Sequence, residues 1–322
     1  MAGPFYVDGA VGNDGNAGTS EGAGNAWATM QKAADTAAAG EIVYIKSSAE
    51  YALSAACDFD TNSGSLASGS IKFIGYDSVI TDGGRPRFTG DSITSAFNVT
   101  QDYLEFHNFR ISVTSSNGIY FNSGATYHLV NNCLIDGGGT NGMYLYGDYV
   151  MVKNCEVSGS YTYSIYTWTN CQVNNCVLHG ASTAGLYSAT RAHNNIIYDC
   201  TTGIHATNWR NATIIGNVID DCTTGVRFDV DFASSAFYNN IISNNTTGVL
   251  QDAGEYQVGG ITDYNAWYEN DADTNNWTKG ANAVNLSADP YTNQAGRDYT
   301  LNSTAGGGAA CKNTGYGPVG LL

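Results

Sequence analysis

One phrase recurs seven times between Asn108 and Val249: an asparagine, then apolar residues, then a glycine followed by another apolar residue. The second anchor is glycine in every repeat except one, where Ser164 replaces it. Because the variation in repeat length is confined to one turn, the pattern predicts a solenoid whose rungs stack directly above one another. The seven asparagines are Asn108, Asn132, Asn154, Asn175, Asn195, Asn217 and Asn240.

The residues that follow each asparagine favour strands. They read Cys-Leu-Ile at 133–135 and Ile-Ile-Tyr at 196–198, rich in β-branched side chains and poor in helix formers. Leucine-rich repeats have the same period but need a dense leucine pattern and a helix or tight helical turn in each repeat, and leucine is sparse here. The sequence therefore predicts an all-β fold, a right-handed parallel β-helix. The seven asparagines are expected to stack as an internal ladder, each amide bonding to the neighbouring rungs.

Composition and charge indicate which kinds of binding partner the sequence does not favour. The 39 glycines and 4 prolines in 322 residues suit many tight turns between strands. A net charge of −16 with only 13 Lys and Arg argues against nucleic acid. No apolar run of about 18 residues exists, so no membrane span is predicted. The N-terminus lacks a basic segment followed by an apolar one, so we expect no signal peptide and synthesis in a cytoplasm.

The eight cysteines occupy repeat positions rather than a disulfide framework. Cys133, Cys155 and Cys176 each follow a ladder asparagine, and Glu156 marks the next position as outward. These thiols are therefore expected to face inward as small hydrophobes, although a stacked disulfide between neighbouring rungs stays open. In later rungs the same position is assigned to Ile196, Val218 and Ile241. Neither a CxxC motif nor a Cys/His pair at zinc spacing occurs, so no structural metal is predicted.

The chain is expected to form a single β-helix domain over residues 1–322. Residues 1–46 would form an N-terminal cap with an amphipathic helix from about 27 to 38 over the first rung. Residues 47–262 would form the rungs, and residues 263–322 a capping tail. Covering both ends would prevent end-to-end pairing of open sheet edges.

One outer face of the predicted helix is aromatic. The first residue after each glycine anchor is apolar and inward, so the next points outward. The candidate binding or interface residues on this face are Tyr120, Tyr144, Tyr146, Tyr166, Trp168 and Tyr187. Ala189, Thr207 and Leu250 take equivalent positions in other rungs. The rings could stack on sugars, be buried against a partner subunit, or simply stabilise the sheet.

The same face turns polar toward its C-terminal end, where the catalytic candidates are His205, Arg227, Asp229 and Asp252. Glycoside hydrolysis needs two carboxyls about 5 to 9 Å apart, and Asp229 and Asp252 take equivalent positions on adjacent rungs. A lyase would need a cationic base, for which Arg227 is the candidate.

Calcium is the one metal that the acidic residues suggest. A lyase would also need a calcium-bridged carboxylate cluster, which Asp220, Asp221, Asp229 and Asp231 could supply. The loop with Asp8, Asp14 and Asn16 could hold calcium, but it lacks the ligand spacing of an EF-hand, so a tight turn is favoured. Acidic residues in such turns are commonly solvated surface, and no cofactor is predicted.

Both ends of the chain resemble a known family. The opening motifs Tyr6-Val-Asp-Gly, Gly12-Asn-Asp-Gly and Gly40-Glu-Ile-Val-Tyr-Ile resemble the N-terminal cap of the right-handed β-helix repeat proteins, the pectin-lyase-like superfamily. So does Ala26-Trp-Ala-Thr-Met-Gln-Lys-Ala. The closing Asp289-Pro-Tyr and Gly296-Arg-Asp-Tyr-Thr-Leu resemble its terminal segment, so that the resemblance covers nearly the whole chain.

The resemblance is specific for fold, not for activity. The superfamily includes lyases, hydrolases, phage tailspikes and proteins without chemistry. The tail Ala305-Gly-Gly-Gly-Ala-Ala-Cys most resembles β-helix proteins encoded among phage virion genes.

That likeness implies a non-catalytic structural protein located in the virion, as a capsid decoration or tail-associated protein. It would dock through its aromatic column onto other virion proteins, itself as a homo-oligomer such as a trimer, or a surface glycan. The alternative is a polysaccharide lyase or glycoside hydrolase that acts on a surface glycan.

Overall fold

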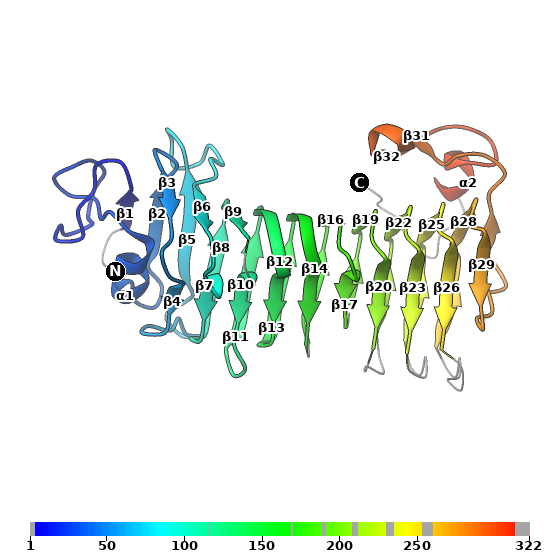
Figure 1. Cartoon of the computed structure of the whole chain (residues 1–322), viewed down its shortest axis with the longest axis horizontal. Helices are drawn as coiled ribbons and strands as arrows, with labels where there is room; N and C mark the ends of the chain where they lie inside the picture. Colours follow the sequence, from blue (N-terminus) through cyan, green and yellow to red (C-terminus); the bar gives the residue numbers. More distant parts are fainter. Residues whose placement is uncertain are drawn as a thin grey trace. The chain divides into compact units, whose positions relative to one another are not determined.

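The computed structural model describes residues 4–114, 116–168, 170–188, 191–207, 212–229, 235–252 and 260–312. Within them, short parallel strands predominate, and the two α-helices, α1 (Met30–Thr36) and α2 (Gly308–Lys312), are short. The predicted all-β parallel β-helix is confirmed (Figure 1). The chain divides into two compact units, residues 1–171 and 172–322.

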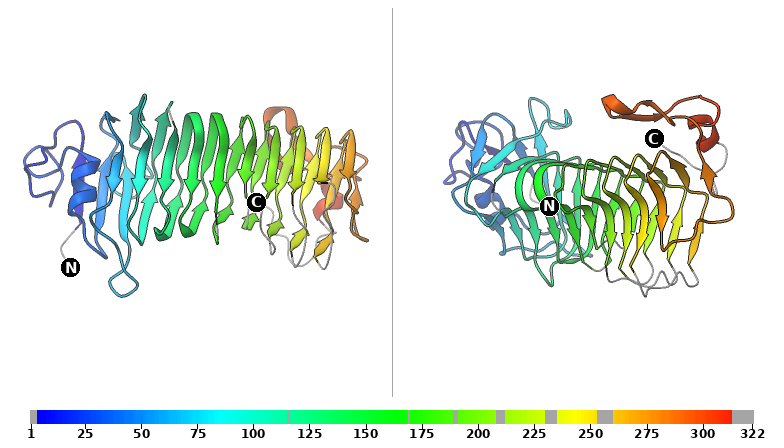
Figure 2. Two further views of the ribbon diagram at one scale, coloured as in Figure 1. Left: turned by 60° about the horizontal axis from the view of Figure 1, so that its bottom comes forward. Right: turned by 45° about the vertical axis from the view of Figure 1, so that its right-hand side comes forward.

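Unit 1 contains two parallel sheets whose strands come from successive rungs (Figure 2). The first sheet pairs, in order, β1 (Phe5–Asp8), β2 (Ile42–Lys46), β5 (Ile71–Tyr76), β8 (Leu104–His107), β11 (Thr126–Asn131) and β13 (Asp148–Lys153). The second contains β3 (Glu50–Ala52), β4 (Cys57–Phe59), β6 (Arg87–Gly90), β7 (Ser95–Val99), β9 (Arg110–Val113), β10 (Asn117–Phe121), β12 (Leu134–Leu145) and β14 (Glu156–Thr167).

Unit 2 repeats the arrangement with shorter strands. Its first sheet pairs β15 (Gln172–Asn174), β18 (Arg191–His193), β21 (Thr213–Ile215), β24 (Ala236–Tyr238) and β27 (Ile261–Asp263). A second row pairs β16 (Val177–His179), β19 (Ile196–Tyr198), β22 (Val218–Asp220), β25 (Ile241–Ser243), β28 (Ala266–Tyr268) and β30 (Val284–Asn285). Beside it run β17 (Ala184–Tyr187), β20 (Thr202–Ala206), β23 (Thr224–Phe228), β26 (Thr247–Gln251) and β29 (Ala272–Asn275). Parallel pairing thus continues beyond residue 262.

The interior of each unit is filled by every second residue of the strands, as the period of a β-strand requires. In the early rungs of unit 1 the filling is largely aromatic: Phe59, Phe73, Phe97 and Phe106 are buried, and Phe59 meets the other three edge-on at ring-centroid distances of 4.9 to 5.5 Å. This packing holds the two sheets of the unit together.

A buried asparagine ladder runs through unit 2. Asn217 is fully buried, and its Nδ2 donates to the Ala192 carbonyl and to Asn240 Oδ1, both at 2.9 Å. Its Oδ1 accepts from the backbone N–H and the Nδ2 of Asn195, again at 2.9 Å. Asn240 continues the ladder to Asn265. Each amide therefore satisfies turn backbone that water cannot reach.

Asn108, Asn132, Asn154 and Asn175 do not form that internal ladder, so for them the prediction is wrong by one residue. All four have left-handed backbone, with φ between 54° and 61°, and lie half-buried or exposed at a turn. Asn132 Nδ2 does reach Asn108 Oδ1, at 2.8 Å, but outside the core. Asparagine tolerates the left-handed region better than most residues, so these four asparagines allow the backbone to turn rather than bond inside the core.

The inward position next to these four turn residues belongs to other side chains: Phe109, Cys133, Cys155 and Cys176. Val177 pairs with Ile196, so Cys176 takes the position of Asn195 in the following rung. Ile196, Val218 and Ile241, which had been assigned inward, therefore lie on the outer side, where they pack against the C-terminal segment. All eight cysteines are buried and carry free thiols.

The N-terminal segment covers the free edge of β1. Trp27 N–H donates to the Tyr6 carbonyl, and Asp8 N–H donates to the Trp27 carbonyl. Helix α1 is shorter than predicted and begins after Thr29, whose hydroxyl accepts from the Lys32 N–H. The capping role assigned to this helix stays a prediction.

We expect Asn217→Ala to lower the free energy of unfolding by about 2 to 4 kcal/mol, because it leaves buried donors and acceptors unpaired and opens a cavity. Urea denaturation measures the change. The matched control is Asn154→Gly at an exposed left-handed position, expected to stay within about 0.5 kcal/mol. Equal losses in the two variants would contradict the assignment of the ladder.

His128 gives the interior of unit 1 a pH dependence. It is buried beside Phe121, its Nδ1 accepts from the Leu104 N–H, and burial lowers its pKa to about 4. Unfolding restores a pKa of about 6.5, so from that pH down to about 4 the unfolded chain binds more protons and the fold loses about 3 kcal/mol.

We expect His128→Leu to remove this part of the pH dependence. His179→Gln, at an outer position, should leave it in place; identical pH profiles for wild type and His128→Leu would contradict it.

Candidate functional site

The predicted aromatic face lies in register in unit 1. Tyr120 on β10 pairs with Tyr144 on β12, which pairs with Tyr166 on β14. The Tyr120 and Tyr144 rings are stacked at 5.3 Å, and Tyr166 meets Tyr144 edge-on at 4.8 Å. Beside them Tyr146 and Trp168 meet at 5.1 Å. We call these five residues the tyrosine face.

The rings of the tyrosine face are half-buried rather than fully exposed. Burial, followed by the charges that Tyr120 and Tyr146 would carry, raises the pKa of Tyr144. Part of each ring is therefore used in packing on its neighbours, and the remainder is open to a partner.

The rest of the predicted column belongs to unit 2. Tyr187, His205, Arg227 and Leu250 pair in sequence from β17 to β26, as expected for one outward position. The Tyr187 ring meets the His205 ring edge-on at 4.9 Å. The predicted neighbour Ala189 lies outside the described residues, and Thr207 is buried, with its hydroxyl bonded to Ser188.

The four catalytic candidates come together in unit 2 and are bound to one another. Arg227 bridges the two carboxylates: its Nε lies 2.8 Å from Asp229 Oδ1, and its terminal nitrogen lies 2.8 Å from Asp252 Oδ2. His205 Nε2 lies 2.8 Å from the other oxygen of Asp229. Together they form a linear chain of ion pairs and hydrogen bonds from His205 through Asp229 and Arg227 to Asp252.

Ion pairing and burial shift the pKa values of three of the four candidates. The hydrogen bond from Arg227 lowers the pKa of Asp252, so this carboxyl is not held protonated as a general acid must be. Burial lowers the pKa of His205 against the opposing charge of Asp229. The hydrogen bond to Asp252 raises the pKa of Arg227, which keeps this guanidinium protonated and so unable to accept a proton.

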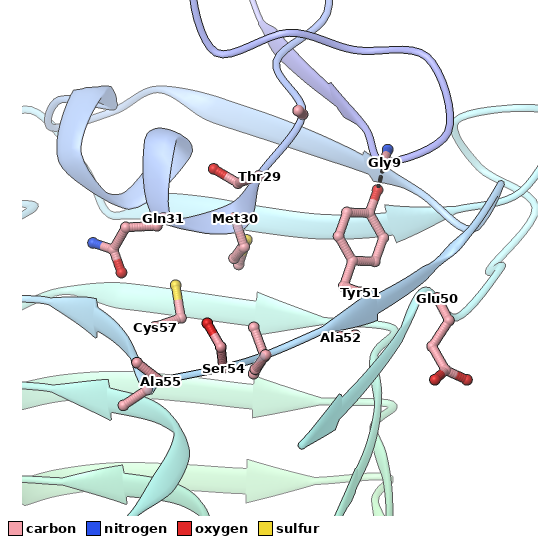
Figure 3. Close-up of a pocket in the computed structure, with 13 residues that line it drawn as sticks. Gly9, Thr29, Met30, Gln31, Glu50, Tyr51, Ala52, Ser54, Ala55 and Cys57 are labelled. Atoms are coloured by element: carbon pink, nitrogen blue, oxygen red, sulfur yellow. Dashed lines mark hydrogen bonds between the residues drawn. The ribbon is translucent and has the colours of Figure 1, made fainter. Parts of the chain in front are cut away.

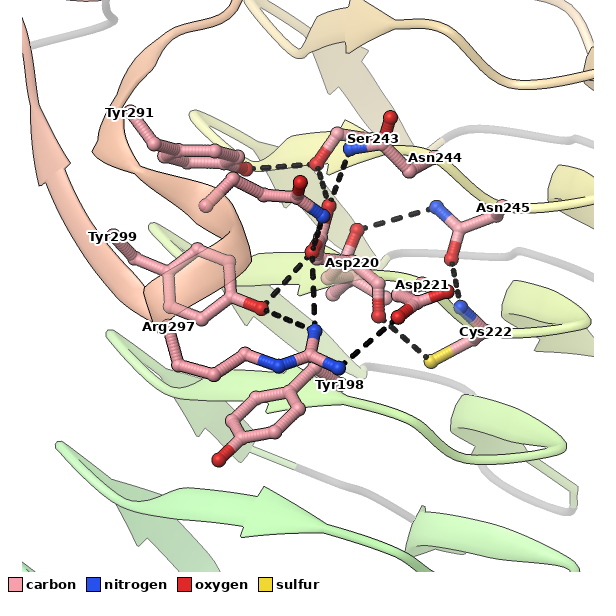
Figure 4. A network of polar contacts seen from close by, with 12 residues as sticks. Tyr198, Asp220, Asp221, Cys222, Ser243, Asn244, Asn245, Tyr291, Arg297 and Tyr299 are labelled. Atoms are coloured by element: carbon pink, nitrogen blue, oxygen red, sulfur yellow. Dashed lines mark hydrogen bonds and ion pairs between the residues drawn. The ribbon is translucent and has the colours of Figure 1, made fainter.

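A second polar cluster surrounds Asp220, which is fully buried at the end of β22 (Figure 4). Ser243 and Asn244 donate to its Oδ1, both at 2.7 Å. Gln294 and Tyr299 donate to its Oδ2, both at 2.9 Å. The last two donors come from the C-terminal segment that contains the hairpin of β31 (Tyr291–Asn293) and β32 (Asp298–Leu301).

The acidic residues considered for a calcium cluster have other partners. Asp220 anchors the C-terminal segment, and Asp221 pairs with Arg297 at 3.1 Å. Asp231 lies outside the described residues. In the N-terminal loop Asp14 accepts from Ala28 and Thr29, and Asn16 donates to Ala23 and Ala26. No group of three His, Cys, Asp or Glu that could hold a metal occurs in the part of the chain described. The expectation of no cofactor, with calcium as the one alternative, stays a prediction.

Two hollows lie in unit 1. One, of about 460 Å³, is bounded by Met30 of α1, Tyr51 and Cys57, and alanines line much of it (Figure 3). The other, of about 550 Å³, is a polar groove across β3, β6, β9 and β12. Two of its carboxylates are paired with arginines, Glu50 with Arg87 at 2.9 Å and Asp136 with the Arg110 Nε at 3.0 Å, whereas Asp91 accepts from the Thr114 hydroxyl.

A second aromatic row in unit 1 was not predicted from the sequence. Tyr103, Tyr127 and Tyr149 stack nearly parallel at 4.8 and 4.9 Å, with ring planes within 14° and 5° of each other. Tyr127 and Tyr149 are 47% and 50% exposed. The sequence does contain a pattern for this row, because a polar residue followed by tyrosine recurs at the spacing of the repeat, as Asp102-Tyr103, Thr126-Tyr127 and Asp148-Tyr149. We call these three residues the turn stack.

All three tyrosines of the turn stack have left-handed backbone, with φ of 55°, 63° and 57°. A side chain of this size in that region costs about 1 to 2 kcal/mol, whereas a stacked aromatic pair gains about 0.5 to 1.5 kcal/mol. The two effects are of the same order, so the stack offers the fold little net stability.

The comparisons with known proteins identify the fold. No protein-family model matches the chain, and no curated protein sequence does. A pectate lyase, Pel9A, is similar in structure, with a TM-score of 0.59 and 15% identity over 88% of this chain and 79% of that one. A lacto-N-biosidase from Eubacterium ramulus has a TM-score of 0.58 and 11% identity over 87% of this chain and 66% of that one. The chain therefore has the pectate-lyase-like parallel β-helix fold.

A phage protein, ORF18 of Geobacillus virus E2, is also similar, with a TM-score of 0.41 and 15% identity over 73% of this chain and 52% of that one. Similarity of this size carries no argument about a shared role. None of the described helices is both long and apolar enough to cross a membrane.

We expect Arg227→Met to raise the pKa of Asp252, because the hydrogen bond from Arg227 is the largest cause of its lowering. Carboxyl NMR titration measures the shift. The matched control is Arg191→Met on the exposed side of β18, which should leave the pKa of Asp252 unchanged. An unchanged Asp252 titration in Arg227→Met would contradict the bridging role.

Proposed function

We propose that this protein is a non-catalytic structural protein of a virion, a capsid decoration or tail-associated β-helix that docks through its tyrosine face. The observation that carries the proposal is the contrast between two outer surfaces. The tyrosine face presents partly exposed rings in register, whereas the carboxylates among the catalytic candidates are bound by Arg227 and His205. The virion setting is supported by the resemblance of the C-terminal segment to phage-encoded β-helix proteins.

The docking partner is a second copy of this chain or another virion protein. Tyrosine and tryptophan are enriched at protein interfaces, where large rigid rings bury area at low entropic cost. A parallel β-helix adds rigidity, because each rung hydrogen-bonds to its neighbours along the sheets.

The second candidate function is a polysaccharide lyase or glycoside hydrolase. Two observations favour it: the solved structures above include a pectate lyase and a lacto-N-biosidase, and the polar groove of unit 1 contains three carboxyls, those of Glu50, Asp91 and Asp136. Against it, Asp91 accepts from Thr114, and the other two carboxyls are paired with arginines.

We expect the wild-type chain to self-associate as its concentration rises, measured by light scattering at about 0.3 M salt, which screens the net charge. Tyr144→Ser and Trp168→Ser should shift association to about tenfold higher concentration, the effect of losing one aromatic contact at an interface. Tyr238→Ser, at a half-buried tyrosine of unit 2, is the matched control and should associate as wild type. A strict monomer at every concentration would contradict docking onto a second copy.

The enzyme alternative has its own measurement. Pectate, polygalacturonate and xylan incubated with the chain should release no new reducing or unsaturated ends. Release that is abolished by Asp229→Asn with Asp252→Asn, or by Asp136→Asn, would replace the structural role with an enzymatic one.

A further inference from the structure

The turn stack is an aromatic surface that the fold does not require. Among the described residues, nineteen other than glycine have left-handed backbone, and nine of them are asparagine. Only four are tyrosine, and three of those form the turn stack. An asparagine would have less backbone strain at each of these three positions. The chain therefore keeps a strained tyrosine where a less strained residue would fit.

The rings open onto a defined patch of unit 1. Tyr127, Leu129 and Asn131 alternate with buried residues along β11, and Tyr149, Met151 and Lys153 do so along β13. Leu129 pairs with Met151, so two half-buried apolar side chains adjoin the exposed rings. Tyrosine and methionine are enriched at protein interfaces.

Carboxylates border the same patch. Asp102 precedes Tyr103 and accepts from the backbone and hydroxyl of Thr126 at 2.7 and 3.0 Å. Asp148 precedes Tyr149 and pairs with Thr126 in the sheet. The whole chain has a net charge of −16, so its field attracts basic partners.

We propose that the turn stack is the docking site for a basic segment of a partner protein that presents arginine. A guanidinium is planar and cationic, so it stacks flat on a tyrosine ring while it donates hydrogen bonds to a neighbouring carboxylate. Tyr149 is the last ring of the row. Tyr127 stacks on one face of this ring, and the residue is still 50% exposed. This site uses none of the residues of the tyrosine face and does not rest on the proposed function.

The probe is a short peptide with three arginines separated by glycines, compared with the same peptide carrying lysines. Each is titrated into the full-length chain, and the tyrosine ring signals are followed by NMR. We expect the arginine peptide to bind wild type about fivefold more tightly than it binds the Tyr127→Asn, Tyr149→Asn double variant. The lysine peptide should bind wild type more weakly than the arginine peptide.

The matched control is Tyr264→Asn. This tyrosine of unit 2 also has left-handed backbone, with φ of 52°, and belongs to no part of the turn stack. None of these substitutions changes the net charge, so non-specific attraction of a cationic peptide is common to all variants. The arginine peptide should bind Tyr264→Asn and Tyr144→Ser as tightly as it binds wild type. The Tyr144→Ser result distinguishes this site from the tyrosine face.

Equal affinity of wild type and the double variant for the arginine peptide would overturn the proposal and leave the rings a packing role. So would an equal loss in Tyr264→Asn, or ring shifts produced by xylohexaose in place of the peptide, which would indicate a sugar site. If the double variant does not fold, Tyr149→Asn alone removes the terminal ring, and an unchanged affinity in that variant would overturn the proposal equally.

Discussion

The hydrogen bonding of buried turns is the constraint on which the structure of unit 2 depends. A parallel β-helix turns its chain at every rung, and each turn brings backbone donors and acceptors into an interior without water. Asn195, Asn217 and Asn240 solve this by repetition, since each amide serves the turn of the rung before it. A residue without a side-chain amide would leave those groups unpaired.

Unit 1 meets the same constraint with different chemistry. Cys133 N–H points at the sulfur of Cys155 at 3.4 Å, a weaker acceptor than an amide oxygen. The phenylalanines, packed both edge-on and stacked, supply apolar contact across the interior of this unit. In both units the constant rung spacing has an outward consequence: any residue type that recurs in the repeat becomes a row of like side chains. The tyrosine face and the turn stack are two such rows.

Much of this was predictable from the sequence, because a solenoid converts periodicity directly into geometry. The strands and the outward position of Tyr120 and Tyr144 follow from the period. The period also places Arg227, Asp229 and Asp252 on one face, but Arg227 pairs in register with Leu250, so its salt bridge to Asp252 was not predicted. The ladder was misplaced in four rungs because asparagine has two uses, as a buried amide and as a residue that tolerates left-handed backbone, and the period does not separate them. The partners of Asp220 had no periodic signal, since Gln294 and Tyr299 reach it from a segment 74 and 79 residues away.

Hydrogen exchange of side-chain amides distinguishes asparagines inside the β-helix from those at its turns. We expect slow exchange for the Nδ2 protons of Asn195, Asn217 and Asn240 and fast exchange for those of Asn154 and Asn175. Fast exchange at Asn217, or equal protection across all five, would contradict the ladder and with it the stacking of rungs that aligns the outer rows.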